Sequence, residues 1–186
     1  MLAGSPCSFH PVLALTLAAL CSAPRAAGAQ GTEPAIVQAK IPPAYAIRIA
    51  HQPTADVLRR VLDGARQRLA EPRCEAVLDA FAAESERPLR DRLGESGQSA
   101  TGYLGLIIFY DGSKHPRCED RSIMAVASPG SRVVHVCPEQ LRERARRNPL
   151  WAEATLIHEA LHTLGLGENP PSSQEITSRV IRRCRR

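Results

Sequence analysis

The sequence predicts an α+β fold, and three observations lead to that prediction. The chain has 186 residues, of which 44% are hydrophobic and 23% charged, a composition typical of a globular protein. Hydrophobic residues recur with helical spacing towards both ends of the folded part, and short β-prone runs lie between them. A chain of this length has room for one ordinary domain, which we expect to span residues 54–186.

The first residues have the pattern of an export signal. A mostly apolar run over residues 11–23 is too short to cross a bilayer and suits the core of a signal peptide. Ala27-Gly28-Ala29 then offers a small-residue cleavage site before Gln30. We therefore expect residues 1–29 to be a signal peptide, no transmembrane segment, and a mature protein that is periplasmic or secreted.

Helices are predicted in the first half of the mature chain. A proline-rich, extended N-terminal segment over residues 30–53 comes first. Apolar residues then recur every three or four positions over residues 54–69, and Thr54 is placed to cap this helix. A second helix is expected over residues 75–84, and the glycines after Pro88 predict a loop.

The second half of the chain predicts strands followed by helices. The β-prone runs, separated by Asp-Gly and Pro-Gly turns, are residues 103–110, 122–127 and 132–137. Helical patterns then cover residues 138–147, residues 150–164, and a last stretch from Ser172 or Ser173 to Arg183.

The cysteines fit an exported protein. Four of the six remain after removal of the signal peptide: Cys74, Cys118, Cys137 and Cys184. An even number in an exported domain predicts two disulfides, with three possible pairings. We favour Cys118–Cys137, which brackets a hairpin-like segment, and Cys74–Cys184, which ties the last helix to an early one. No two of them have the close spacing of a cysteine zinc site.

The net charge of +5 says little about partners. Acidic residues (19) are nearly as common as basic ones (24), so the composition does not indicate a specific nucleic-acid partner. The basic residues near the C-terminus, 182–186, permit a weak attraction to anionic surfaces of the cell envelope, and they equally suit the end of a helix.

One motif carries chemistry, the sequence His-Glu-Ala-Leu-His at residues 158–162. On a helix, positions four apart lie on the same face, so His158 and His162 can bind one zinc ion. Glu159 lies beside them, where it can activate a zinc-bound water as a general base. The plainer alternative is a helix with two surface histidines.

The string LIHEALHTLGLGENPPSSQEIT around this motif resembles the zincin metallopeptidases of the small exported bacterial type. The resemblance covers mainly residues 103–186. It implies a small twisted mixed sheet packed on an active-site helix with flanking helices. It also implies that residues 122–127 form the edge strand, that residues 132–137 form the inner strand, and that the substrate is a peptide or protein.

Two residues are candidates for the third zinc ligand. Gly165 and Glu168 occupy the positions at which metzincins have a turn glycine and a ligand, and no methionine follows the motif. Gluzincins take the ligand from the next helix, which here would be Glu175. Glu175 is also placed to form a capping box with Ser172. We favour Glu168, and the subclass stays open between metzincin and gluzincin.

A hydrolase of this class also needs a group that stabilises the oxyanion. No Tyr or His follows the motif, and the upstream candidates are Tyr103, Tyr110, His115 and His135. The alternative to a peptidase is a zinc-stabilised, non-catalytic binding or structural module of the cell envelope. That alternative predicts a closed site in which both Glu168 and Glu175 bind the metal.

Overall fold

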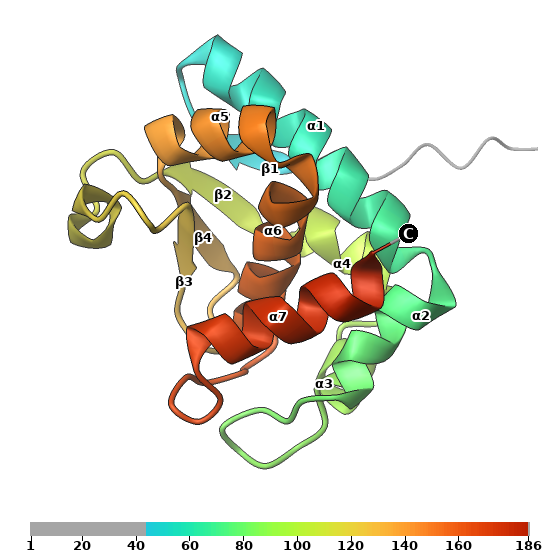
Figure 1. Ribbon diagram of the computed structural model, residues 1–186. Helices are drawn as coiled ribbons and strands as arrows, with labels where there is room; N and C mark the ends of the chain where they lie inside the picture. The colour runs from blue at the N-terminus through green and yellow to red at the C-terminus, as the bar shows by residue number, and fades with distance from the viewer. Residues whose placement is uncertain (1–43, 186) are drawn as a thin grey trace, which may run out of the picture. The chain divides into compact units, whose positions relative to one another are not determined.

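The computed structural model describes residues 44–185, which form an α+β fold of seven α-helices and a four-stranded mixed sheet (Figure 1). The predicted α+β class is confirmed. The predicted signal peptide, and residues 30–43 of the predicted extended segment, lie outside the described residues.

The sheet has the strand order β1-β2-β4-β3. The strands are β1 (Ala46–Arg48), β2 (Ile108–Asp111), β3 (Ala125–Ala127) and β4 (Val133–Val136). The first three strands in this order are parallel, and β3 runs antiparallel to β4 at the edge of the sheet. Phe109 and Val134 are register partners and fully buried, whereas the next residue of β2, Tyr110, is 42% exposed. One face of the sheet therefore packs into the core.

The helices cover this core from several directions. They are α1 (Gln52–Leu69), α2 (Pro72–Glu75), α3 (Leu89–Glu95), α4 (Ala100–Tyr103), α5 (Pro138–Arg147), α6 (Pro149–Thr163) and α7 (Ser173–Cys184). Three 3-10 segments are η1 (Ala76–Asp79), η2 (Leu104–Leu106) and η3 (Pro116–Glu119). Helix α6 packs against α1, α5 and α7 and against strands β3 and β4, so it is the central element of the fold (Figure 1).

The start of α1 differs from the prediction. The helix begins at Gln52, with His51 as its N-cap and Pro53 in its first turn, where proline is favourable. Thr54 is not the cap; it is buried and its hydroxyl accepts a hydrogen bond from Arg142 (2.8 Å). Strand β1 lies within the segment that we expected to be extended.

The second predicted helix ends earlier than expected. Helix α2 and η1 cover residues 72–79, and the following residues form a turn closed by a bridge between Ala82 and Pro88. The predicted glycine loop is also wrong in part, because Leu89 and Leu93 are buried in the core and hold this stretch as α3.

The predicted strand over residues 103–110 is correct only in its last part. Ser99 caps α4 by accepting a hydrogen bond from the Gly102 N–H (3.1 Å), and the helical path continues through η2. Tyr103 and Leu104 are buried on this path, so packing overrides their strand propensity. The strand predicted over residues 132–137 and the three C-terminal helices are confirmed, with small shifts at their ends. Of the strand predicted over residues 122–127, only residues 125–127 form β3.

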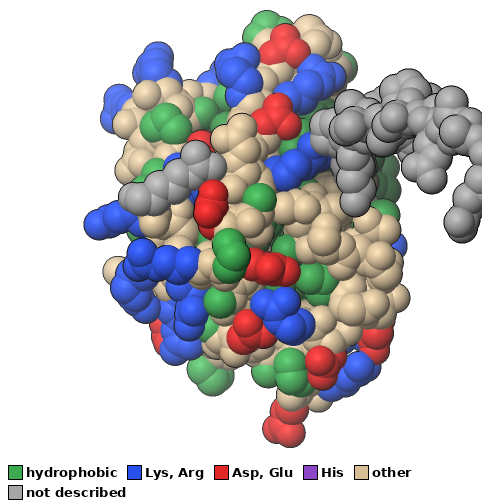
Figure 2. Space-filling view, turned by 90° about the vertical axis from the view of Figure 1, so that its right-hand side faces the viewer, with side chains coloured by type: hydrophobic (Ala, Val, Ile, Leu, Met, Phe, Trp, Pro, Cys, Tyr) green, Lys and Arg blue, Asp and Glu red, His purple; other side chains and the backbone are tan. Residues whose placement is uncertain are grey.

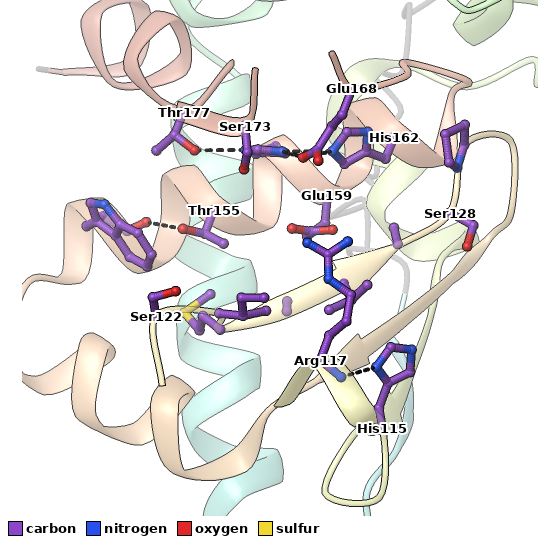
Figure 3. Close-up of a pocket in the computed structure, with 18 residues that line it drawn as sticks. His115, Arg117, Ser122, Ser128, Thr155, Glu159, His162, Glu168, Ser173 and Thr177 are labelled. Atoms are coloured by element: carbon purple, nitrogen blue, oxygen red, sulfur yellow. Dashed lines mark hydrogen bonds and ion pairs between the residues drawn. The ribbon is translucent and has the colours of Figure 1, made fainter. Parts of the chain in front are cut away.

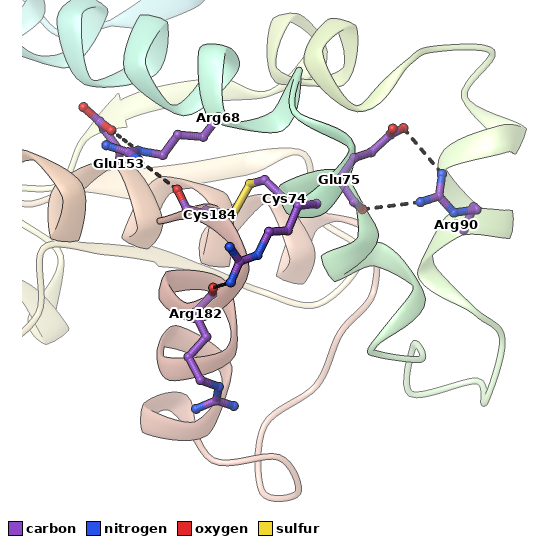
Figure 4. The surroundings of a disulfide bond; sticks show 8 residues. Arg68, Cys74, Glu75, Arg90, Glu153, Arg182 and Cys184 are labelled. Atoms are coloured by element: carbon purple, nitrogen blue, oxygen red, sulfur yellow. Dashed lines mark hydrogen bonds and ion pairs between the residues drawn. A yellow bond between two sulfur atoms is a disulfide. The ribbon is translucent and has the colours of Figure 1, made fainter. Parts of the chain in front are cut away.

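Both favoured disulfides form, Cys74–Cys184 and Cys118–Cys137. The first joins α2 to the end of α7, next to the ion pair of Arg68 with Glu153 (Figure 4). The second joins η3 to the residue before α5. Within residues 44–185, no helix is both long and apolar enough to cross a membrane.

Charges of both signs share the surface. In the view of Figure 2, Lys and Arg side chains lie next to Asp and Glu side chains, with hydrophobic groups scattered between them. No histidine is visible among the described residues in that view. His158 and His162 of α6 line a cleft beside this helix.

Candidate metal centre

Helix α6 carries the His-Glu-Ala-Leu-His motif into the interior. Asn148 caps the helix by accepting a hydrogen bond from the Trp151 N–H (3.1 Å), and Pro149 occupies its first turn. Every residue from Ala154 to Thr163 is buried, because the helix is surrounded by α1, α5, α7 and the sheet. The motif therefore does not lie on a solvent-exposed helix, and the alternative of two surface histidines is wrong.

A tight turn ends α6 and brings Glu168 back to the motif. The Gly165 N–H donates to the His162 carbonyl (2.7 Å), and the Leu166 N–H donates to the Leu161 carbonyl (3.1 Å). This pair of bonds is a Schellman motif, which requires the left-handed backbone that Gly165 adopts (φ +106°). The glycine thus makes the reversal that places Glu168 beside the histidines.

Three side chains converge at this point: His158, His162 and Glu168. The two Nε2 atoms are 2.8 Å apart. The Glu168 Oε1 atom lies 3.6 Å from Nε2 of His158 and 3.3 Å from Nε2 of His162. These ligand atoms all lie within 4.8 Å of one another, so the group could hold a metal ion (Figure 3).

Each of these three side chains is oriented by a hydrogen bond to a residue outside the group. The Nδ1–H of His162 donates to the Leu166 carbonyl (2.6 Å), which leaves the Nε2 lone pair free to face the group. Nδ1 of His158 is hydrogen-bonded to the Thr177 hydroxyl (2.8 Å), and Ser173 is hydrogen-bonded to Glu168. Such outer contacts fix the ring orientation of metal-binding histidines.

The protonation of the group also suits a cation. Burial lowers the pKa of His158, which favours the neutral imidazole. The polar contact with His158 lowers the pKa of Glu168 to about 2, so this carboxylate is ionised. Two imidazoles and one carboxylate are the ligand set of many catalytic zinc sites.

Glu159 points to the edge strand, away from the three-residue group. Its carboxylate accepts a hydrogen bond from the backbone of Ala127 in β3. Burial raises the pKa of Glu159 to about 8, and the bond from Ala127 opposes this shift. Glu159 is therefore held within reach of the cleft between α6 and β3, with a carboxyl group suited to exchanging protons near neutral pH.

The cleft has a volume of about 540 Å³. Its lining residues come from β3 and the two residues after it, from α6 and α7, from Glu168 between these helices, and from the cleft-wall loop, by which we mean residues 112–124 between β2 and β3. The cleft-wall loop contributes His115 and Arg117, and the Arg117 guanidinium points towards the Glu159 carboxylate (Figure 3).

The remaining predicted residues lie outside this group. Glu175 forms an ion pair with Arg179, and its N–H donates to Ser172 (3.3 Å), so it belongs to the N-terminal cap of α7. Of the four upstream oxyanion candidates, only His115 is among the described residues that line the cleft. Tyr103 is buried in the core and His135 contacts the ring of His115.

Three residues of the site were not found from the sequence. Ser173 and Thr177 are four positions apart on α7, and this spacing is a signal that they share a face. Arg117 has no such signal, because the Cys118–Cys137 disulfide and the strand order bring it to the cleft.

Comparisons of the chain with protein-family models, with curated proteins and with solved structures find no match.

Proposed function

We propose that this chain is an exported, zincin-like zinc metallopeptidase. The observation that carries the proposal is the convergence of His158, His162 and Glu168 beside Glu159 at the wall of a cleft. The two disulfides, and the absence of a membrane-spanning helix among residues 44–185, are compatible with export.

The donor atoms of the site suit zinc. Two imidazole nitrogens and a carboxylate oxygen, each oriented by an outer hydrogen bond, are the set expected for a catalytic zinc. Zinc, when bound, supplies a Lewis acid that polarises a carbonyl and makes water easier to ionise. In this proposal His158, His162 and Glu168 hold the ion, and the Thr177 hydroxyl and Leu166 carbonyl keep the rings in position.

Glu159 has the role of the general base. Its carboxylate takes a proton from the water that attacks the scissile carbonyl and gives a proton to the departing amine. The Ala127 N–H holds the carboxylate towards the cleft. Since β3 is at the edge of the sheet and lines the cleft, a peptide can bind there as an added strand.

The position of Glu175 favours catalysis over a structural zinc site. A non-catalytic module of the cell envelope calls for a closed set of four protein ligands that includes Glu175. Glu175 instead pairs with Arg179 on α7, and the three-residue group borders the cleft. A site of three protein ligands beside a cleft leaves room for water and substrate.

The proposal is tested with purified, zinc-loaded protein and a library of peptides. We expect cleavage that stops when a chelator removes the zinc. Glu159→Gln is expected to lower kcat/KM by about 100- to 10,000-fold while the zinc content stays unchanged. Glu143→Gln is the matched control, because Glu143 is a half-exposed residue of α5 that pairs with Arg147 and does not line the cleft.

Unchanged hydrolysis in Glu159→Gln contradicts the proposed role of the base. Stoichiometric zinc in a wild-type protein that cleaves none of the peptides supports the structural module instead. Zinc content and circular dichroism of each variant exclude misfolding as the cause of a lost activity.

A further inference from the structure

Arg117 lines the cleft but has no role in the proposed zinc binding or general-base catalysis. It lies in η3 of the cleft-wall loop, and it is the one Lys or Arg among the described residues that line the cleft. Within residues 44–185, no carboxylate oxygen lies within the 4.0 Å ion-pair distance of its guanidinium. The guanidinium nevertheless points into the cleft, towards Glu159 (Figure 3).

The two carboxylates of the cleft already have partners of their own. Glu168 faces the two histidines, and Glu159 accepts the hydrogen bond from Ala127. Much of the remaining lining is apolar or uncharged, including Met124, Val126 and Trp151. An arginine beside such a surface can form paired hydrogen bonds with a ligand that brings a carboxylate.

The cleft-wall loop holds Arg117 firmly enough for recognition. The next residue, Cys118, is bonded to Cys137, which directly follows β4, and the Cys118 carbonyl accepts a hydrogen bond from Gln140 of α5 (2.9 Å). The Arg117 N–H donates to Nδ1 of His115 (3.3 Å). The backbone of Arg117 is thus fixed against the sheet, while its side chain extends over the cleft.

We propose that Arg117 binds a substrate carboxylate next to the scissile bond, so that the enzyme prefers peptides with a negative charge at that position. The inference rests on the proposed function, because it names the substrate class of the same cleft. A C-terminal carboxylate and an Asp or Glu side chain offer the same chemistry, and the test separates these two sources.

The test uses acetylated octapeptides in matched pairs. One pair has a free or an amidated C-terminus, and the other set carries Glu or Gln at each position in turn. In one of the two sets, we expect the wild type to cleave the charged peptide with a kcat/KM about 10- to 100-fold higher than that for its neutral counterpart. A preference within the first pair identifies the C-terminal carboxylate, and a preference within the second identifies the side chain.

Variants then assign the preference to Arg117. Arg117→Gln is expected to remove it mainly through KM, and Arg117→Lys to restore it in part. With an additional peptide that carries Lys at the same position, Arg117→Glu is expected to favour Lys over Glu, a reversal that loss of structure cannot produce. Arg121→Gln is the matched control, because Arg121 is 81% exposed, pairs with Glu139 and does not line the cleft.

Binding to zinc-loaded Glu159→Gln protein, measured by calorimetry, separates this inference from the proposed function. A carboxylate preference in binding that disappears in Glu159→Gln/Arg117→Gln supports the role of Arg117 even if the wild type cleaves no peptide. Cleavage with equal rates for charged and neutral peptides overturns the inference and leaves the peptidase standing. A preference that persists without Arg117 also overturns it, because the metal then attracts the carboxylate.

Discussion

The two disulfides hold two regions that are built in different ways. The C-terminal anchor, by which we mean Cys74, Cys184, Arg68 and Glu153, lies where α1, α2, α6 and α7 meet (Figure 4). Both of its cysteines are buried, and the Arg68 guanidinium contacts Glu153 and the Cys184 carbonyl (2.8 Å). Helix α7 adds buried apolar residues to this region.

The cleft-wall loop has almost no core of its own. None of its residues from 113 to 123 is buried, and η3 contributes no side chain to the hydrophobic core. The Cys118–Cys137 disulfide and a hydrogen bond from Gln140 take the place of packing. We infer that the Cys74–Cys184 disulfide supports the stability of the fold, whereas the Cys118–Cys137 disulfide positions Arg117 over the cleft.

Removal of the anchor disulfide is expected to have the largest effect on stability. The Cys74→Ala/Cys184→Ala variant opens a link between residues 110 positions apart, and the loss is about 4 to 5 kcal/mol of the free energy of unfolding. Denaturant unfolding measures this loss. Zinc content and peptide preference are expected to stay unchanged in the folded fraction, and a loss below about 1 kcal/mol contradicts the anchoring role.

Removal of the cleft-wall disulfide is expected to cost less stability and more specificity. Its cysteines are only 19 positions apart, so Cys118→Ala/Cys137→Ala loses about 3 kcal/mol. The preference for a substrate carboxylate is expected to fall to that of Arg117→Gln, because the loop no longer holds the guanidinium in place. Equal preference in this variant and the wild type would refute the positioning role. The anchor variant is its control.

The smallest expected effect is a pH dependence of the free energy of unfolding, caused by the ion pair between Asp79 and Arg90. A hydrogen bond from Arg90 is the main cause of a lowered pKa for Asp79. A lowered pKa in the folded state stabilises the protein above the carboxyl group's usual pKa of about 3.9, and this contribution is lost as the pH falls below it. Because both side chains are about half exposed (42% and 53%), the contribution is below about 1 kcal/mol.

Unfolding of wild type and Asp79→Asn at pH 6 and pH 3 measures this contribution. The variant is expected to be slightly less stable at pH 6, with a smaller difference at pH 3. A difference that is the same at both pH values rules out the ion pair as its source.

Local patterns predicted much of the fold and part of the site. The spacing of His158 and His162, and the glycine at 165, depend on a single helix and its end, so the sequence alone indicates them. The helical path through Tyr103 could not be read from its apolar neighbours, because the cap at Ser99 and burial in the core decide it. A pattern of glycines likewise could not reveal that Leu93 is buried on a helix.

The site residues that come from segments far apart in the sequence were not predicted. Thr177 reaches His158 only because α7 packs against α6, and Arg117 reaches the cleft only because β3 is the edge strand and Cys118 is tied to Cys137. For the same reason, the sequence alone could not decide whether Glu168 or Glu175 is the third ligand. Both spacings are compatible with the sequence, and the turn at Gly165 brings only Glu168 to the histidines.

The zinc content of three purified proteins, measured by elemental mass spectrometry, tests whether His158, His162 and Glu168 bind zinc. We expect one zinc per chain in the wild type and in Glu175→Ala, and a strong loss of zinc in Glu168→Ala. A wild type without stoichiometric zinc, or full retention of zinc in Glu168→Ala, would show that His158, His162 and Glu168 do not form a zinc site.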